Sequence, residues 1–124
     1  MNSYFNSYQV HIRLYRDSVI RIGQLGSFTF PKGYYIYTGS AKKNILARVR
    51  YHALPKKNPR WHIDYLLNSE YARIIEIHLH MIDECKLNKS TCGKAIIPGF
   101  GSSDCLMKCI SHLKYCGDIL KLNN

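Results

Sequence analysis

The sequence has 124 residues, which is enough for one hydrophobic core and leaves no room for a second domain of ordinary size. Hydrophobic residues make up 46% and charged residues 21% of the chain, as in ordinary globular proteins, which excludes disordered and low-complexity proteins. The apolar runs are far shorter than a membrane-spanning helix, and residues 1–13 contain no signal-peptide block, so we expect a soluble cytoplasmic domain without membrane contact.

Positive charge is concentrated in the first half of the chain. The formal net charge is +10, and residues 1–60 contain 11 Lys and Arg against the single acid Asp17, whereas residues 61–124 contain seven of each sign. Residues 42–60 contain seven basic residues and no acid. Such a segment is typical of proteins that bind a polyanion, so nucleic acid, and DNA in particular, is the expected partner. A solvated face that only keeps the protein soluble is the alternative. The basic residues of this segment are Lys42, Lys43, Arg48, Arg50, Lys56, Lys57 and Arg60.

The first forty residues predict strands. Val10, Ile12 and Leu14 alternate with polar residues, which is the period of a half-buried strand. Aromatic and β-branched residues between turn signals predict further strand segments. Because the turns are short, we expect an antiparallel meander. The predicted strand segments are residues 9–15, 19–23, 28–30 and 34–38.

Two helices are expected next. Apolar residues at helical spacing predict a helix from Asn44 to about position 54, on which Arg48 and His52 point the same way. A capping residue followed by Pro59 predicts the start of a second helix at residues 60–67.

The second half of the chain predicts one more strand and two more helices. In the strand, at residues 72–82, Ile75 and Ile77 face one way and His78 the other. A short helix is expected at 83–89, and a final helix at 103–116. The whole pattern predicts a single α+β domain over residues 1–124, with a small antiparallel sheet flanked by helices.

Two tyrosine-containing triplets and a helical arginine resemble the motif of the GIY-YIG nuclease superfamily. Residues 37–39 are Tyr-Thr-Gly, residues 6–8 are Asn-Ser-Tyr, and Arg48 lies on the basic helix that follows. The chain is most similar to a small branch of this superfamily, long catalogued only as a domain of unknown function and sometimes fused to endonuclease III-type repair enzymes. Further signatures of the branch extend the resemblance over nearly the whole chain, at residues 61–67, 84–85, 99–105 and 111–113.

This resemblance implies metal-dependent cleavage of DNA phosphodiester bonds, with a role in DNA repair. Tyr8 or Tyr37 would activate water with His52 as helper, Arg48 would bind the phosphate, and Asp64 would hold Mg²⁺ or Mn²⁺ together with waters. A tyrosine base needs a pKa below its usual value of about 10, and neighbouring cations would lower that pKa. The interpretation requires the two phenols and the guanidinium to gather around one phosphate. Phenols buried away from solvent would contradict it.

Two other functions are open at this point. A domain that kept the fold and lost the chemistry would bind nucleic acid without cleaving it. A metal protein with an incidental basic face would bind metal through cysteine and histidine and have no affinity for DNA.

The five cysteines all lie in the last 40 positions and include no Cys-x-x-Cys pair, so we expect reduced thiols rather than a disulfide framework. Several of them share one helical stripe, which is typical of a core face and also allows a structural zinc site. A second metal hypothesis concerns the polar side of the strand at 72–82, where Glu76, His78 and His80 lie together. For the first hypothesis, the structural zinc site, the candidate ligands are Cys85, Cys105, Cys109 and His112.

Overall fold

The computed structural model describes residues 5–41, 43–102 and 109–118. Its helices are α1 (Ile45–His52), α2 (His62–Leu67) and α3 (Glu84–Ser90). A single 3-10 turn, Gly23–Leu25, joins the second strand to the third. The strands are β1 (Ser7–Leu14), β2 (Ser18–Arg21), β3 (Ser27–Phe30), β4 (Gly33–Ser40), β5 (Ala72–His80) and β6 (Leu113–Tyr115).

Four strands form the central sheet, in the order β5-β1-β4-β6, with every neighbouring pair antiparallel. This confirms the predicted α+β class with a small antiparallel sheet. The predicted meander is wrong, because β1 pairs directly with β4 while β2 and β3 form a separate two-stranded ribbon. β2 has only four residues; Ile20 packs against the core, whereas Val19 on the opposite face is 75% exposed.

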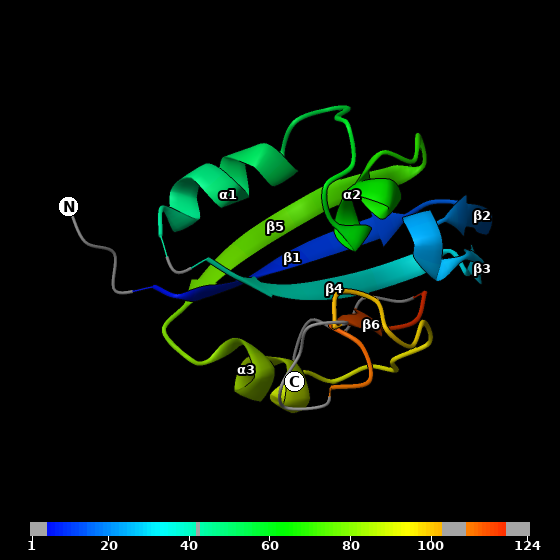
Figure 1. Ribbon diagram of the computed structural model, residues 1–124. Coiled ribbons are helices and arrows are strands. Elements are labelled where there is room, and N and C mark those ends of the chain that lie inside the picture. Colours follow the sequence, from blue (N-terminus) through cyan, green and yellow to red (C-terminus); the bar gives the residue numbers. More distant parts are fainter. Residues whose placement is uncertain (1–4, 42, 103–108, 119–124) are drawn as a thin grey trace.

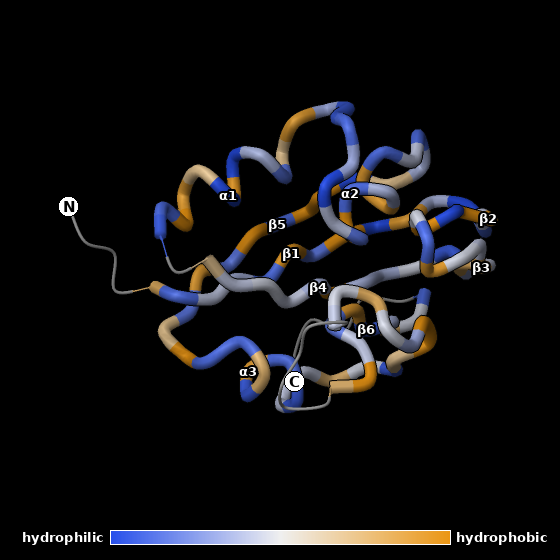
Figure 2. The backbone as a smooth tube through the Cα atoms, in the orientation of Figure 1, coloured by the Kyte–Doolittle hydropathy of each residue, from blue (hydrophilic) through white to orange (hydrophobic). Residues whose placement is uncertain are grey.

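The core lies on one face of this sheet. Val10, Ile12 and Leu14 have no solvent exposure, as their alternation predicts, and Tyr35 on β4 lies in the same cluster. In Figure 2, hydrophobic and hydrophilic residues alternate along β1, β5 and α1, as in elements that bury one face.

Helices cover both faces of the sheet. In Figure 1, α1 and α2 lie above the sheet and α3 lies below it. The Tyr8 hydroxyl on β1 hydrogen-bonds to His52 of α1, while the next residue, Gln9, points to the opposite face and donates to Thr91 just after α3. No helix within the described residues is long and apolar enough to cross a membrane.

The side chains of β5 do not all point to the faces that the sequence predicts. The pairing between β1 and β5 shifts between His11 and Ile12, which is a β-bulge, so Ile74 and Ile77 pack against the core while Ile75 is 44% exposed. The prediction that Ile75 and Ile77 lie on the same face of the strand is therefore wrong.

The second helix begins later than predicted. It starts at His62 instead of position 60, and Pro59 lies outside it. The Asp64 carboxylate accepts hydrogen bonds from the backbone N–H groups of Arg60 and Trp61, so these residues form the cap of the helix and not its first turn.

The predicted final helix is wrong over residues 109–116. Leu113–Tyr115 instead form β6, which pairs with the Tyr35–Tyr37 segment of β4 and closes that edge of the sheet. The remainder of the prediction, residues 103–108, lies outside the described residues.

Candidate active site and metal group

The two motif tyrosines meet on the core face of the sheet. Tyr8 lies on β1 and Tyr37 on the adjacent strand β4, and their ring centroids are 6.4 Å apart. Gly39 lies opposite Tyr8 in the strand register, and a Cβ atom at this position would come within 2.5 Å of the Tyr8 hydroxyl oxygen. The glycine of the Tyr-Thr-Gly triplet therefore makes room for the Tyr8 phenol.

His52, at the end of α1, completes a buried polar pair with Tyr8. The Tyr8 hydroxyl forms a hydrogen bond of 2.7 Å with His52 Nε2, and the His52 ring meets the Tyr37 ring edge-on at 6.2 Å between centroids. Burial lowers the pKa of His52 to about 4, and the charges of Lys57 and Arg48 act in the same direction against the opposing effect of Asp64. His52 is therefore neutral at physiological pH.

Arg48 approaches this pair from the same helix. Its guanidinium donates to the Ser40 carbonyl oxygen over 3.1 Å and lies 4.3 Å from the centre of the Trp61 ring. Arg48 also lowers the pKa of Tyr8 through its charge and a hydrogen bond. Burial outweighs this effect and raises the pKa of Tyr8 to about 12.

The expected lowering of the tyrosine pKa is thus wrong. The pKa of Tyr37 also lies well above its usual value, because the side chain is buried and Tyr8 and Glu84 are close. Tyr8 has no exposed surface and Tyr37 only 8%, so neither phenol is open to bulk water. The proximity that the nuclease interpretation requires is present, but its condition of solvent-accessible phenols is not met.

Asp64, the predicted metal ligand, is fully buried on α2. Its Oδ2 atom accepts hydrogen bonds from the Tyr51 hydroxyl and from the two backbone N–H groups at the start of α2. Its Oδ1 atom lies 3.8 Å from His52 Nδ1. This carboxylate therefore caps a helix and faces the buried side of His52.

Glu84 is the site residue that the sequence interpretation missed. Its Oε1 atom accepts from the Ser40 hydroxyl over 2.9 Å, and its Oε2 atom lies 2.8 Å from His112 Nδ1. It is close enough to raise the pKa of both Tyr8 and Tyr37. The sequence signal was the Glu-Cys signature at the start of α3, but Ser40 and Glu84 are 44 positions apart and no local pattern connects them.

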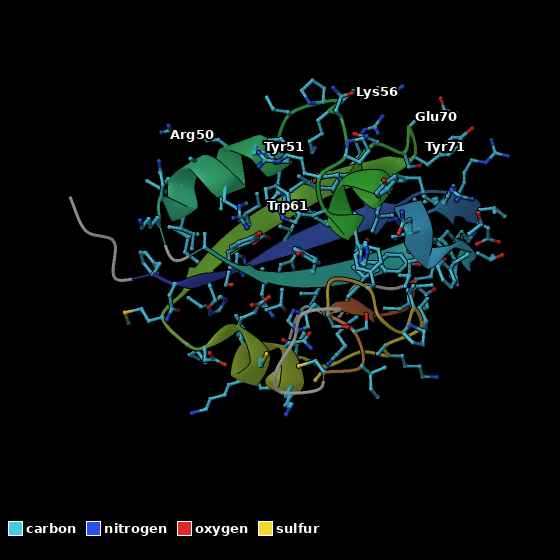
Figure 3. The ribbon with its side chains drawn as sticks, viewed as in Figure 1. Arg50, Tyr51, Lys56, Trp61, Glu70 and Tyr71 are labelled. Atoms are coloured by element: carbon cyan, nitrogen blue, oxygen red, sulfur yellow. The ribbon has the colours of Figure 1, made fainter. Side chains whose placement is uncertain are left out.

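A positive surface extends from this site over α1 and the loop that follows. Lys42 lies outside the described residues. In Figure 3, Arg50 and Lys56 point outward on the upper side of the molecule, and Tyr51 and Trp61 lie between α1 and α2. We call this the basic surface; Lys43, Arg50, Lys56 and Arg60 in it are exposed, and Arg48 and Lys57 are half-buried.

A second cluster lies beyond Glu84, on the α3 side of the sheet. Cys85, Cys109 and His112 each present a ligand atom, all within 4.8 Å of one another, so the group could bind a metal ion. Cys105 lies outside the described residues. Across the parts of the chain that the structure describes, no other group of three such ligands comes together, and the Glu76, His78 and His80 set does not meet this distance.

His62 binds a loop. Its Nδ1 atom accepts a hydrogen bond from the Gly101 N–H over 2.9 Å, and its ring contacts Phe100. It therefore anchors the loop before β6 and takes no part in the Tyr8 cluster.

Comparison with known proteins places the chain in one family. Residues 7–124 match a family model described as a domain of unknown function, DUF123. Neither a curated protein nor a solved structure matches the chain. The matched segment includes every residue of the site described above.

Proposed function

We propose that this chain, which belongs to the DUF123 family of domains of unknown function, binds DNA through its basic surface and cleaves a phosphodiester bond beside Arg48. One observation carries the proposal: Tyr8, His52 and Arg48, from two different elements, contact one another at the edge of that surface. The GIY-YIG resemblance of the same residues supports it, as does the concentration of ionisable groups with shifted pKa values, which is typical of active sites.

Arg48 and Arg60 are the basic side chains best positioned to bind phosphate. Their guanidinium carbons lie 4.3 and 4.9 Å from the Trp61 ring centre, so the indole restrains both side chains. A guanidinium donates two parallel hydrogen bonds to a phosphate. Contacts of this kind position the backbone and carry no sequence information, so we expect recognition of DNA structure in preference to base sequence.

The chemistry differs from the one that the sequence suggests. Since the raised pKa values keep both phenols protonated at neutral pH, neither acts as a base. The Tyr8 hydroxyl is already hydrogen-bonded to His52, so Tyr37 is the phenol that donates a hydrogen bond toward developing charge. Neutral His52 orients the Tyr8 hydroxyl, and Arg48 neutralises charge on the phosphoryl oxygens. A bound Mg²⁺ or Mn²⁺ would supply the acidified water that attacks phosphorus.

Glu84 suits that ion better than Asp64 does. Mg²⁺ is held by one or two carboxylates and keeps several waters, so its ligand must face solvent. The Glu84 side chain is 25% exposed, whereas Asp64 has no exposure. We therefore propose Glu84 as the carboxylate ligand in place of Asp64.

A DNA-binding module without catalytic activity is the second candidate. The burial of Tyr8 and Tyr37 favours it, because a phosphate that docks on Arg48 meets phenols that the fold covers.

The test is a cleavage assay on supercoiled, branched and single-stranded DNA with Mg²⁺ or Mn²⁺. We expect wild-type protein to cleave at least one substrate, Tyr37→Phe and Arg48→Ala to lose the activity, and Lys89→Ala, an exposed change on α3 outside the basic surface, to keep it. Circular dichroism checks that each variant folds. DNA binding without cleavage on every substrate would support the module, and cleavage that persists in both site variants would place the activity elsewhere or in a contaminant.

We also propose zinc as the metal of the Cys85, Cys109 and His112 group. Thiolate and imidazole are the ligands of structural zinc sites, and Mg²⁺ prefers oxygen. Cys105 is the further ligand that the sequence predicts. A protein that contains zinc and has no affinity for DNA would support the third interpretation, a metal protein with an incidental basic face.

A further inference from the structure

Hydrogen bonds connect the metal group to the proposed phosphate site in three steps. His112 Nδ1 lies 2.8 Å from Glu84 Oε2, and the Ser40 hydroxyl donates to Glu84 Oε1 over 2.9 Å. The Ser40 carbonyl oxygen in turn accepts from Arg48 over 3.1 Å. Each step joins a different element, so the path runs from the segment before β6 through α3 and β4 to α1.

The geometry of the donors fits a tetrahedral metal. Cys85 Sγ lies 3.9 Å from His112 Nε2. Zinc bonds of about 2.3 Å to sulfur and about 2.0 Å to nitrogen, at a tetrahedral angle, would separate the two ligand atoms by about 3.5 Å. A small inward movement of the two side chains would therefore let both bind one ion.

The hydrogen bond with Glu84 selects the tautomer of His112 that can bind a metal ion through Nε2. A carboxylate only accepts hydrogen bonds, so the proton lies on His112 Nδ1 and donates to Glu84. The lone pair is then on Nε2, the atom that faces Cys85. A carboxylate that holds the far nitrogen of a ligating histidine orients the ring and strengthens the metal site.

We infer that Glu84 is a positioning residue shared by two sites: it holds His112 for zinc and, through Ser40, makes the placement of Arg48 depend on whether zinc is bound. Zinc loading would thus regulate DNA binding. The regulatory half rests on the proposed function, whereas the zinc half does not.

The first test measures zinc affinity of the full chain by competition with a chromophoric chelator, using Zn²⁺ itself as the probe. We expect Glu84→Gln to weaken zinc binding about 10- to 100-fold. Lys89→Ala, an exposed change on the same helix, serves as the control and should bind zinc as wild type does. Circular dichroism verifies folding. Wild type that takes up no zinc, or Glu84→Gln with unchanged affinity, would overturn the inference.

The second test compares DNA affinity of zinc-loaded and zinc-free protein, without Mg²⁺ and at one salt concentration. We expect the loaded form to bind about 5-fold tighter or more, and DNA to raise zinc affinity by the same factor. If zinc-free protein unfolds, the comparison is between zinc-saturated wild type and zinc-saturated Glu84→Gln, and weaker binding by the variant is expected. Equal DNA affinities would refute the regulation. If neither form binds DNA, the proposed function fails, while the zinc result still decides the role of Glu84.

Discussion

The Tyr8–His52 pair illustrates how one cause shifts two pKa values in opposite directions. Burial disfavours the charged form of each group, so it raises the pKa of the phenol and lowers that of the imidazole. Both partners are therefore neutral, and the hydrogen bond between them joins an uncharged donor to an uncharged acceptor.

Removal of the Tyr8 hydroxyl should destabilise the protein. In Tyr8→Phe, the buried His52 Nε2 atom loses its hydrogen-bond partner, and an unsatisfied buried polar atom costs about 1–3 kcal/mol of the free energy of unfolding. Urea unfolding measures this change. Tyr15→Phe, at an exposed tyrosine, is the control and should match wild type. An equal midpoint for Tyr8→Phe and wild type would contradict the importance of this hydrogen bond.

His52 should also make stability depend on pH. Its pKa is about 4 in the folded state and about 6.5 when unfolded, so between these values the unfolded chain binds the proton more tightly. The stability contributed by neutral His52 is complete above pH 6.5 and decreases as pH falls toward 4, by up to about 3 kcal/mol. Asp64 opposes this loss, and Lys57 and Arg48 add to it.

The measurement compares urea unfolding of wild type and His52→Gln between pH 4.5 and 7.5, a window set by the two pKa values. The glutamine variant does not titrate, so its free energy of unfolding should fall less steeply as the pH is lowered. Parallel curves for the two proteins would show that His52 titrates equally in the folded and unfolded states.

At the scale of secondary structure, α1 depends on an unusual N-terminal residue. Asn44 has a left-handed backbone with φ of 52°, and its side chain accepts a hydrogen bond from the Ala47 N–H. Asparagine suits both requirements, because it tolerates positive φ and caps helices.

Two substitutions separate these contributions. Asn44→Ala loses the cap and must adopt a strained backbone, so we expect a loss of about 1–2 kcal/mol of stability. Asn44→Gly tolerates the backbone and loses only the cap, at a cost of a few tenths of a kcal/mol. Urea midpoints give both values, and equal losses would mean that backbone strain contributes nothing.

Among the described residues, each strand and helix from β1 to α3 lies within about two residues of its prediction, and β6 is the element that was not predicted. β1, α1 and α3 appear within a residue or two of the sequence prediction, since each has several apolar or capping positions in register. β6 has three residues, too few for a strand period, and its conformation comes from pairing with the edge of β4. Capping residues near position 103 favoured a helix over this segment, and the pairing with β4 overrides that preference.

For the molecule as a whole, the basic surface predicts DNA binding that weakens with salt. The logarithm of affinity should fall linearly with the logarithm of salt concentration, with a slope of about −0.9 per neutralised phosphate. Arg50→Ala should reduce the magnitude of this slope by about 1. Lys86→Ala, on α3 at the other side of the sheet, should leave it unchanged. Equal slopes for all three proteins would exclude α1 from the interface.

The amino-acid order alone determined the strand and helix periods, the placement of nearly all net charge on one segment, and the residues of the tyrosine and arginine motif, because each is a property of neighbours along the chain. Tertiary structure decided which groups became neutral and which carboxylate joined the site. Burial depends on what packs above a side chain, and the contact that assigns Glu84 spans 44 positions between β4 and α3. Solvent exclusion and long-range pairing arise only when the chain is folded, so they are absent from any local pattern.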